Sequence, residues 1–472
     1  MKFLLINPPM DYNVIKKELS FEAYLPPLGL LYIARPLEKQ GHEVKLIDFV
    51  AEQYTEKKLI SALSEIDVVC ITVTSQIVTS ASKITDMIKK INPKIKIIIG
   101  GPHCTIQKKE ALNEIKADIS VIGDGEEVII EIVDALNLKK KLSKVHGIYY
   151  REKDVIKKGL PAVEIKDLDS IDFPSWHLIK KYNYGKEALT GVTALARGKI
   201  TSIMTSRGCP FNCRFCVSKS IFNSCRMRST ENVVKELEEI SKEYDTVFAV
   251  DDNFLMNKKR AHEIMDALIK KNLDLDIWIA GIRVTDADEE LFIKMKKAGV
   301  KSLEFGIESG NQEVLEYYNK KITLEKVKKS IKLSKKTGFL TIGNIIFGAP
   351  IEKDKHINDS INFVKELNLD FAFFYGFNYL KGSEIWEDAY KAGKIKENEM
   401  FRQTDSESGL GNFTPEEIRE KLHYAFKSYY FSPKYILSQF FRSMFIYRNF
   451  RVFKAGLKLI LEQREDTLFA SK

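Results

Sequence analysis

The sequence predicts an α/β protein in which a Rossmann-like, doubly wound parallel sheet is followed by a partial (β/α)6 barrel and a helical C-terminal tail. Over residues 1–136, short apolar runs alternate with amphipathic helix patterns, which is typical of parallel strands buried on both faces. The alternation resumes over residues 200–377. We expect four segments: a Rossmann-like domain (1–145), a hairpin and linker (146–190), the partial barrel (191–395) and a loop with a basic, aromatic helical region (396–472).

The composition is that of an ordinary globular chain. The 472 residues are 44% hydrophobic and 29% charged, and the length suggests about three domains or two with an appendage. Three of the six cysteines lie in one loop, unlike a secreted disulfide framework. No apolar run approaches the about 20 residues of a membrane span, and none resembles a signal peptide, so we expect a cytoplasmic protein. The net charge of +9 is spread over Lys-rich helix faces, and no nucleic acid partner is expected.

In the N-terminal domain, apolar runs and helical periodicity give the expected elements. Strands are expected at Lys2–Ile6, Glu43–Ile47, Val68–Val73, Ile95–Ile99 and Ile119–Ile122. Helices are expected at Leu28–Gln40, Glu56–Ser64, Thr79–Ile91, Lys108–Glu114 and Glu126–Leu136.

The loops at the carboxyl ends of these strands are where ligands of doubly wound sheets bind. They contain Asn7-Pro8-Pro9, Thr74-Ser75, Gly100-Gly101-Pro102-His103 and Gly123-Asp124-Gly125-Glu126. A dinucleotide fold would have G-x-G-x-x-G after the first strand. Prolines stand there instead and lack the backbone N–H groups of a phosphate cradle. NAD binding is therefore disfavoured.

The linker and barrel follow the same rules. His146–Lys158 alternates like a hairpin with Asp154 near the turn, and the acidic, Pro-punctuated run 167–176 is typical of a domain boundary. Barrel strands are expected at Ile200–Thr205, Thr246–Val250, Ile277–Ile282, Ser302–Phe305, Thr341–Phe347 and Phe371–Phe377. Helices are expected at Val233–Tyr244, Lys258–Lys271, Ala287–Ala298, Gln312–Tyr318, Leu324–Thr337 and Asp359–Leu367.

Three cysteines stand on the loop that leaves the first barrel strand. Cys209, Cys213 and Cys216 have the spacing C-x3-C-x2-C, which lets three thiolates converge on one metal centre but does not suit disulfides. Soft thiolates select iron–sulfur clusters or zinc. A closed zinc site needs a fourth ligand, and none stands at ligand spacing, whereas three ligands on a four-iron cube leave one iron open. The alternative is a structural metal knuckle or three unrelated thiols.

With Phe215 before the last cysteine, this loop resembles that of the radical S-adenosylmethionine (SAM) superfamily. The resemblance implies a 4Fe–4S cluster on the three cysteines, which are also the catalytic set, with SAM chelated by the open iron. It implies that Phe215 lies by the adenine and that Glu308 contacts the ribose or amino group. The implied SAM-binding set is Phe215, Asp251, Asp252, Arg283, Gly306, Glu308, Ser309, Gly343 and Asn344.

For any one of these residues, a barrel-rim charge or a turn glycine is the alternative. The weakest match is Gly348-Ala349-Pro350-Ile351-Glu352, where the family usually shows Pro-Gly-Glu-Thr.

The strand-end loops of the first domain, with Leu28-Gly29, resemble the cobalamin-binding domain fused to many radical SAM enzymes. The family's mutases carry D-x-H-x-x-G, and none of the seven histidines here fits it, so cobalamin is expected without a histidine lower ligand. A domain that has lost its ligand is the alternative. The implied cobalamin-binding set is Asn7, Pro8, Pro9, Leu28, Gly29, Thr74, Ser75, Gly100, Gly101, Pro102, His103, Gly123, Gly125 and Glu126.

The tail is basic and aromatic. From Lys421 to Leu461 there is no Asp or Glu, while Lys and Arg recur among many Phe and Tyr. Helices that cap the barrel are the favoured interpretation, and a peripheral membrane contact through residues 421–461 is the second. Stacking on nucleic acid is a further alternative.

Together these resemblances imply a cobalamin-dependent C-methyltransferase. In the family mechanism, a reduced cluster splits SAM to a 5′-deoxyadenosyl radical, which takes hydrogen from an unactivated carbon that then receives a methyl group from methylcobalamin. The implied partners are an electron donor such as ferredoxin or flavodoxin and an unknown small-molecule or lipid substrate. The alternatives are oxidative cyclisation or other carbon-skeleton chemistry with the same cofactors, and a non-catalytic corrinoid or redox sensor.

Overall fold

A computed structural model describes residues 1–10, 25–184, 195–284, 288–446 and 453–454. The chain forms two compact units, one built from residues up to 187 with 220–223, the other from most of the remainder.

The first unit is built on a seven-stranded sheet of order β2-β1-β3-β4-β5-β6-β7. Strands β1 to β5 are parallel, as their nearly continuous apolar sequences predict. The order 2-1-3-4-5 places the switch in strand order between β1 and β3, where doubly wound sheets bind ligands. The strands are β1 (Lys2–Asn7), β2 (Glu43–Asp48), β3 (Val68–Thr72), β4 (Lys96–Gly100), β5 (Ile119–Val121), β6 (Ile148–Glu152) and β7 (Val155–Lys158).

The predicted hairpin is confirmed as β6 and β7, but it is part of this sheet and not of a separate linker. Strand β6 pairs antiparallel with β5, with Val121 opposite Ile148, and β7 pairs antiparallel with β6. Later along the chain, the described residues up to 184 include three short 3-10 turns: η2 (Leu142–Lys144), η3 (Leu168–Ser170) and η4 (Trp176–Ile179).

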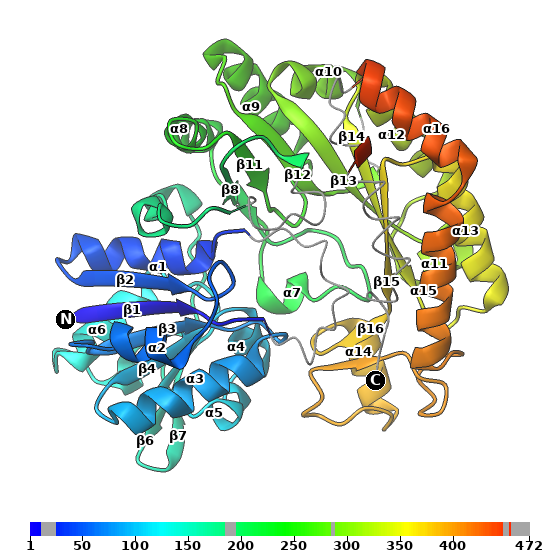
Figure 1. Cartoon of the computed structure of the whole chain (residues 1–472). Helices are drawn as coiled ribbons and strands as arrows, with labels where there is room; N and C mark the ends of the chain where they lie inside the picture. The colour runs from blue at the N-terminus through cyan, green and yellow to red at the C-terminus, as the bar shows by residue number, and fades with distance from the viewer. Residues whose placement is uncertain (11–24, 185–194, 285–287, 447–452, 455–472) are drawn as a thin grey trace. The chain divides into compact units, whose positions relative to one another are not determined.

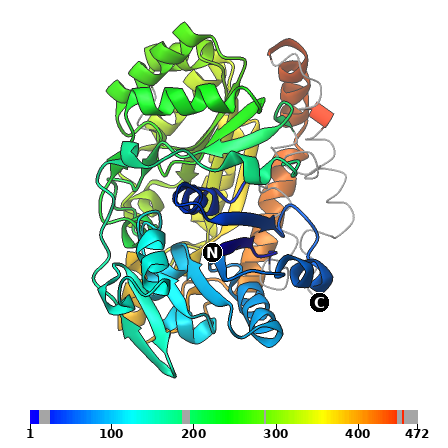
Figure 2. The same cartoon turned by 90° about the vertical axis from the view of Figure 1, so that its left-hand side faces the viewer.

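Helices cover both faces of the sheet (Figures 1 and 2). Alternate residues of β1 are buried on opposite faces: Leu4 and Ile6 pack under α2 to α5, and α1 packs on β1 and against α6 on the other face. The helices are α1 (Leu28–Lys39), α2 (Glu56–Ala62), α3 (Val78–Ile91), α4 (Pro102–Gln107), α5 (Glu110–Glu114) and α6 (Val128–Leu136).

Helix α4 was not predicted. Gly101 has φ +112° and Pro102 stands in the first turn, which is the arrangement that starts a helix directly after β4. The helix expected from Lys108 begins at Glu110, because Lys108 has φ +57° and separates α4 from α5.

The second unit is built on six parallel strands of order β15-β14-β13-β12-β11-β8. The two end strands are not paired with each other, so the barrel is open. All six predicted strands are confirmed, with shifted ends: β8 (Ile200–Ile203), β11 (Thr246–Ala249), β12 (Asp276–Ile282), β13 (Val300–Glu308), β14 (Leu340–Phe347) and β15 (Phe371–Gly376).

Helices line the outer side of this curved sheet (Figure 1). Helices α8, α9, α10, α12 and α13 each pack against the next one in this order, as in a β/α barrel. They are α8 (Thr230–Ile240), α9 (Lys258–Lys271), α10 (Glu289–Lys297), α11 (Gln312–Tyr317), α12 (Leu324–Thr337) and α13 (Asp354–Leu367).

Smaller elements complete the unit. The expected loop at 396–412 contains β17 (Phe401–Gln403), which pairs antiparallel with β16 (Asn378–Leu380). The others are β9 (Ser206–Arg207), β10 (Arg226–Met227), α7 (Ser218–Ile221) and α14 (Glu384–Lys391).

The tail begins with α15 (Pro415–Tyr430) and α16 (Pro433–Phe441), followed by the π-helical turn η7 (Arg442–Ile446). Three of its tyrosines pack on the barrel. Tyr429 and Tyr435 donate to the carbonyls of Leu369 and Asp370, each at 2.7 Å, and Tyr430 donates to the Ala372 carbonyl at 3.0 Å. The expected capping role is therefore confirmed for this part, and most residues beyond 446 lie outside the described residues. No helix among the described residues is long and apolar enough to cross a membrane.

Candidate functional site

The cysteine loop is held rigidly by a residue that lies between two of the cysteines. The Arg214 guanidinium donates to Glu384 and to Asp388 of α14, each at 2.7 Å, and lies 4.7 Å from the Tyr317 ring. Its backbone N–H donates to the Tyr318 carbonyl at 3.0 Å. Arg214 therefore fixes the loop between α14 and the end of α11.

The three thiols lie near one another and are free of disulfides. Cys213 and Cys209 both act electrostatically on Cys216, and the Cys216 N–H donates to the Cys213 carbonyl at 3.0 Å. Cys216 keeps water-accessible surface, but the protein atoms around it raise the pKa of its thiol to about 11. Partial burial also raises the pKa of Cys209. Both thiols are thus protonated near neutral pH until a metal cation replaces the protons.

The chemistry of this donor set fits an iron–sulfur cluster, because it consists of three soft thiolates with no competing disulfide. Within the described residues, however, no three His, Cys, Asp or Glu side chains already converge as a metal site. The assignment of the cluster to Cys209, Cys213 and Cys216 therefore stays a prediction.

A buried ion pair stands at the end of β13. Lys320 Nζ lies 2.6 Å from Glu308 Oε1, and both side chains are about nine-tenths buried. Burial alone would lower the pKa of Lys320, but Glu308 and the Cys213 thiol raise it above its usual value. Gly306 is required beside this pair, because a Cβ there would lie 2.5 Å from Glu308 Oε1. Glu308 itself has φ +66°, a strained conformation that aims its carboxylate at Lys320.

Arg283 follows directly after β12 and approaches the same cysteine. Its Nη1 lies 4.0 Å from Cys213 Sγ, and its Nη2 donates to the Lys320 carbonyl. The guanidinium lies 3.8 Å from the centre of the Phe211 ring. Arg283 and Lys320 therefore bring two positive charges to the side of Cys213.

Buried polar atoms without partners mark the inside of the barrel. Among the described residues, Asn344 Oδ1, Arg283 Nε and the Tyr318 hydroxyl have no hydrogen-bond partner. Asn344 donates its Nδ2 to Glu304 at 2.6 Å, and burial raises the pKa of Glu304. Leaving such atoms unpaired is costly, so they are candidate hydrogen-bond partners for a polar ligand such as SAM.

The two neighbouring aspartates after β11 behave differently. Asp251 is buried and accepts from the N–H groups of Thr205 at 2.6 Å and Ser206 at 3.2 Å, so it holds the turn before the cysteine loop. Burial raises the pKa of Asp251. Asp252 is exposed, accepts from Ser218 Oγ at 2.9 Å and acts electrostatically on Cys209 and Cys216. Of the two, Asp252 is the one beside the cysteines.

Three other predicted SAM residues have internal contacts. The Phe215 ring packs edge-on against Tyr318 with ring centres 4.9 Å apart. Ser309 is fully buried, with its Oγ 3.0 Å from that of Ser360. A Cβ on Gly343 would lie 2.6 Å from Ile307 and Leu369 side chains. These contacts give each residue a packing role, and their SAM contacts stay predictions.

The sequence reasoning missed Arg214, Lys320 and Tyr318. Arg214 lies within the cysteine motif, so its position was the available signal. Lys320 and Tyr318 follow α11 and carry no motif, and only the fold brings Lys320 to Cys213 and Tyr318 to Phe215.

In the first unit, the predicted loops gather at the carboxyl ends of parallel strands. A Cβ on Gly101 would lie 2.8 Å from the Val73 carbonyl oxygen, so glycine is required for β3 and β4 to end this closely. Gly29 and Gly123 have open space, with no atom within 4 Å of a Cβ position, as expected for backbone that lies against a large flat ligand. The residues present therefore fit a corrinoid.

His103 is not available as a metal ligand. It is 1% exposed, its Nε2 lies 2.6 Å from Glu114 Oε2, and its Nδ1 lies 3.4 Å from Ser75 Oγ. Both ring nitrogens face protein partners, so His103 and Ser75 form part of the loop's own framework.

Asn7 belongs to a buried network at the ends of β1 and β2. It donates to Asp48 at 2.8 Å, and Tyr184 donates to the other oxygen of Asp48 at 2.7 Å. Tyr182 donates to Glu52 at 2.8 Å and accepts from the Asp48 N–H. Burial raises the pKa of Asp48. This network was not predicted from the sequence. Tyr182 and Tyr184 follow the acidic run at 167–176 and are far along the chain from Asn7 and Asp48, so only the fold brings them together.

The second unit is a partial parallel barrel with three thiols beyond its first strand. The first unit is a doubly wound sheet with glycine-rich strand ends. Similarity to known proteins identifies the class of enzyme that these features define. The radical SAM superfamily matches residues 203–364, and the B12 binding domain matches residues 19–133. The chain belongs to the radical SAM superfamily, and within it to the enzymes with an N-terminal B12-binding domain.

Three relatives illustrate this membership. "Uncharacterized methyltransferase PH0819" of Pyrococcus horikoshii is 33% identical over 450 residues, which are 93% of this chain and 95% of the relative. "Anaerobic magnesium-protoporphyrin IX monomethyl ester cyclase" of Rubrivivax gelatinosus is 29% identical over 387 residues, 79% and 67% of the two chains. The solved structure of the radical SAM methyltransferase TsrM from Kitasatospora setae matches with a TM-score of 0.69 and 18% identity, covering 84% of this chain and 77% of that one.

These findings confirm the predicted fold class, the enzyme class and the cofactor types, namely SAM, an iron–sulfur cluster and cobalamin. Enzymes of this superfamily also need a reductant. The sensor alternative is set aside, because the chain's relatives are enzymes.

Proposed function

We propose that the protein is a cobalamin-dependent radical SAM methyltransferase that methylates an unactivated carbon of a small-molecule or lipid substrate. The observation that carries the proposal is the charged cluster on one side of Cys213, in which Arg283, Lys320 and Glu308 stand with unpaired buried polar atoms nearby. The relative at 33% identity is called a methyltransferase.

In this proposal Cys209, Cys213 and Cys216 hold a 4Fe–4S cluster. When bound, the cluster supplies the electron that cleaves SAM. Arg214 keeps the cysteine loop in place, and Asp252 and Glu308 would orient the amino and hydroxyl groups of SAM. Asn344 would accept a hydrogen bond from the nucleoside through its unpaired oxygen.

The corrinoid would be held by the glycine-rich strand ends of the first unit. Gly29 and Gly123 would let the backbone lie against it, and Gly101 keeps the ends of β3 and β4 close together, with the other predicted contacts on the same loops. The predicted limits 191–395 for the barrel and 396–472 for the tail stay part of the proposal, whereas the limit between 1–145 and 146–190 moves, because the hairpin belongs to the first sheet. We also propose a cytoplasmic placement, with ferredoxin or flavodoxin as electron donor.

A second candidate is oxidative cyclisation, which the similarity to the magnesium-protoporphyrin ester cyclase favours. The two reactions differ in how they use SAM, because only methylation consumes a second SAM as methyl donor. Extract from a deletion strain would be incubated with the reconstituted enzyme and SAM that carries a deuterated methyl group.

Methylation is supported if one metabolite gains the label and S-adenosylhomocysteine forms together with 5′-deoxyadenosine. A product without label, formed with 5′-deoxyadenosine alone, would show cyclisation or another oxidation instead.

A further inference from the structure

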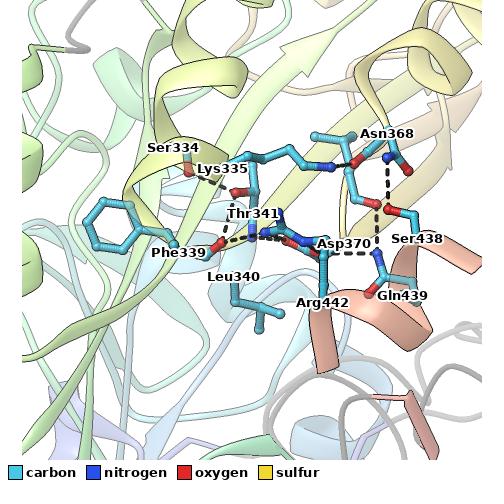
Figure 3. A network of polar contacts seen from close by, with 12 residues as sticks. Ser334, Lys335, Phe339, Leu340, Thr341, Asn368, Asp370, Ser438, Gln439 and Arg442 are labelled. Atoms are coloured by element: carbon cyan, nitrogen blue, oxygen red, sulfur yellow. Dashed lines mark hydrogen bonds and ion pairs between the residues drawn. The ribbon is translucent and has the colours of Figure 1, made fainter. Parts of the chain in front are cut away.

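The segment formed by α16 and η7 has its polar face against the barrel. Over α16 and η7 the buried residues are Tyr435, Gln439, Arg442 and Ser443, which the helical spacing places on one side. Arg442 donates to both oxygens of Asp370, at 2.8 and 3.1 Å, and Gln439 donates to the same carboxylate at 3.1 Å (Figure 3). The tail is thus attached to the start of β15 by polar contacts.

The outward face of the same segment is apolar. The spacing of its residues, such as Leu437, Phe441 and Phe445, repeats about every four positions, so they form one stripe, and Phe441 and Phe445 stack with ring centres 6.2 Å apart. Phe445 is 70% exposed. We define the tail stripe as the exposed residues Leu437, Phe440, Phe441, Met444, Phe445 and Ile446.

A helix on a globular protein normally shows the reverse arrangement, with apolar residues inward. A contiguous exposed apolar surface of this kind marks an interaction site. The next described aromatic residue, Phe453, lies edge-on to Phe440 with ring centres 5.6 Å apart and extends the aromatic surface.

The charge around the tail stripe is positive. In the sequence, the segment from Lys421 to Leu461 has eight Lys and Arg residues and no Asp or Glu, although Lys421 and Arg442 are paired with Asp354 and Asp370. Lys434, one turn before Leu437, is exposed. At the other end, Lys296 Nζ and Ile446 both lie 3.7 Å from the position of a Cβ on Gly338, so a further ammonium group borders the stripe.

We propose that the tail stripe inserts into the surface of a bilayer that contains anionic lipids. Its apolar side chains would enter the boundary of the acyl chains, and the bordering lysines would contact the phosphate headgroups. A second copy of the chain would bring two basic segments together without carboxylates of their own, so charge favours the lipid surface.

This contact is separate from the proposed chemistry. Arg442 donates to the Phe339 carbonyl at 3.2 Å, and Asp370 accepts from the Thr341 N–H at 2.8 Å, so the tail docks at the amino ends of β14 and β15. The candidate SAM residues lie at the carboxyl ends of the strands. The tail stripe would therefore anchor the enzyme without forming part of its active site.

The test is sedimentation of the purified full-length chain with vesicles of phosphatidylcholine alone or mixed with phosphatidylglycerol. We expect binding to the mixed vesicles that weakens as salt is added. The double variant Phe441→Ser/Phe445→Ser should bind at least tenfold more weakly. Ile60→Ser, which removes an exposed apolar side chain of α2 in the first unit, should bind as the wild type does.

Circular dichroism and melting temperature would verify that both variants fold. The proposal is overturned if the wild type does not bind the mixed vesicles, or if the double variant binds as tightly as the wild type. A dimer without lipid that the double variant dissociates, together with no vesicle binding, would assign the stripe to a second copy instead.

Discussion

Lys320 Nζ lies 2.6 Å from Glu308 Oε1 in the interior of the barrel, and this pair connects the end of β13 to the cysteine loop. The Lys320 charge acts on Cys213, and its carbonyl accepts from Arg283, which itself approaches the same sulfur. The pair is buried, so each charge is stabilised mainly by the other, and Lys320 also interacts electrostatically with Cys213.

Replacing Lys320 with Met should destabilise the second unit strongly, because Glu308 would remain as a buried, unpaired carboxylate. We expect a loss of about 3–5 kcal/mol in the free energy of unfolding, measured by chemical denaturation of the apo chain. The double variant Lys320→Met/Glu308→Gln should recover a large part of the loss, because it removes both charges. A double-variant loss equal to the sum of the losses of Lys320→Met and Glu308→Gln would show that the pair is not coupled.

Cys213→Ala should abolish cluster binding and leave the corrinoid bound, because the two cofactors are assigned to different units. Iron content after anaerobic reconstitution and corrinoid absorbance measure the two separately. Cys225→Ala is the matched control: Cys225 lies near the loop, with its Sγ 3.5 Å from the Gly208 carbonyl oxygen, but is not a proposed ligand. Loss of iron in the Cys225 variant would contradict the ligand assignment.

Arg283→Gln should make the cluster harder to reduce, since a positive charge beside Cys213 favours the reduced state. A unit charge at 4 Å is worth at most about 4 kcal/mol at an effective dielectric constant of 20, which corresponds to a shift of up to roughly 170 mV. Potentiometric titration followed by electron paramagnetic resonance would measure it. An unchanged or higher potential would remove Arg283 from this role.

Glu352 should make the protein less stable as pH rises. It is fully buried, and burial raises the pKa of Glu352 from 4.5 to about 7 although the N–H groups of Gly348 and Ala349 donate to it. Between these pH values the unfolded chain releases the proton and the folded chain retains it, so stability is present below pH 4.5 and is lost as pH rises through about 7.

Glu352→Gln removes this titration and keeps an acceptor for both N–H groups. Relative to the variant, the wild type should lose up to roughly 3 kcal/mol between pH 4.5 and 8 in denaturant titrations. Parallel pH profiles of the two proteins would show that Glu352 does not titrate in this range.

Gly29→Leu should weaken corrinoid binding without harming the fold. Gly29 stands in the first turns of α1 with open space around it, so a side chain there avoids clashes and improves helix propensity by up to about 1 kcal/mol. Equilibrium dialysis with cobalamin measures affinity, and thermal melting of the apo chain verifies folding. Unchanged affinity would place the corrinoid away from α1.

The alternation of apolar strands and amphipathic helices was enough to predict the parallel part of both sheets, because the central strands are buried on both faces and each helix on one. Helix α4 was missed because its residues 102–107 have glycine and proline in front, which read as a loop. The hairpin was placed outside the first sheet because pairing of β6 with β5 is a long-range contact that local periodicity does not encode.

The candidate site was predictable only where a motif marks it. The cysteines and the polar strand ends follow from spacing, whereas Lys320 reaches Cys213 only through the fold. The sequence also could not distinguish Asp251 from Asp252, because neighbouring residues at a strand end point in different directions. The structure directs Asp251 to the backbone of Thr205 and leaves Asp252 exposed beside the cysteines.

The most direct measurement is the nucleoside product of the reconstituted enzyme. The chain would be loaded anaerobically with iron and sulfide, its iron content determined, and SAM and dithionite added. We predict that the wild type forms 5′-deoxyadenosine and that Cys213→Ala does not. A wild-type protein with a verified four-iron cluster that leaves SAM intact would contradict the assignment of radical SAM chemistry to this chain.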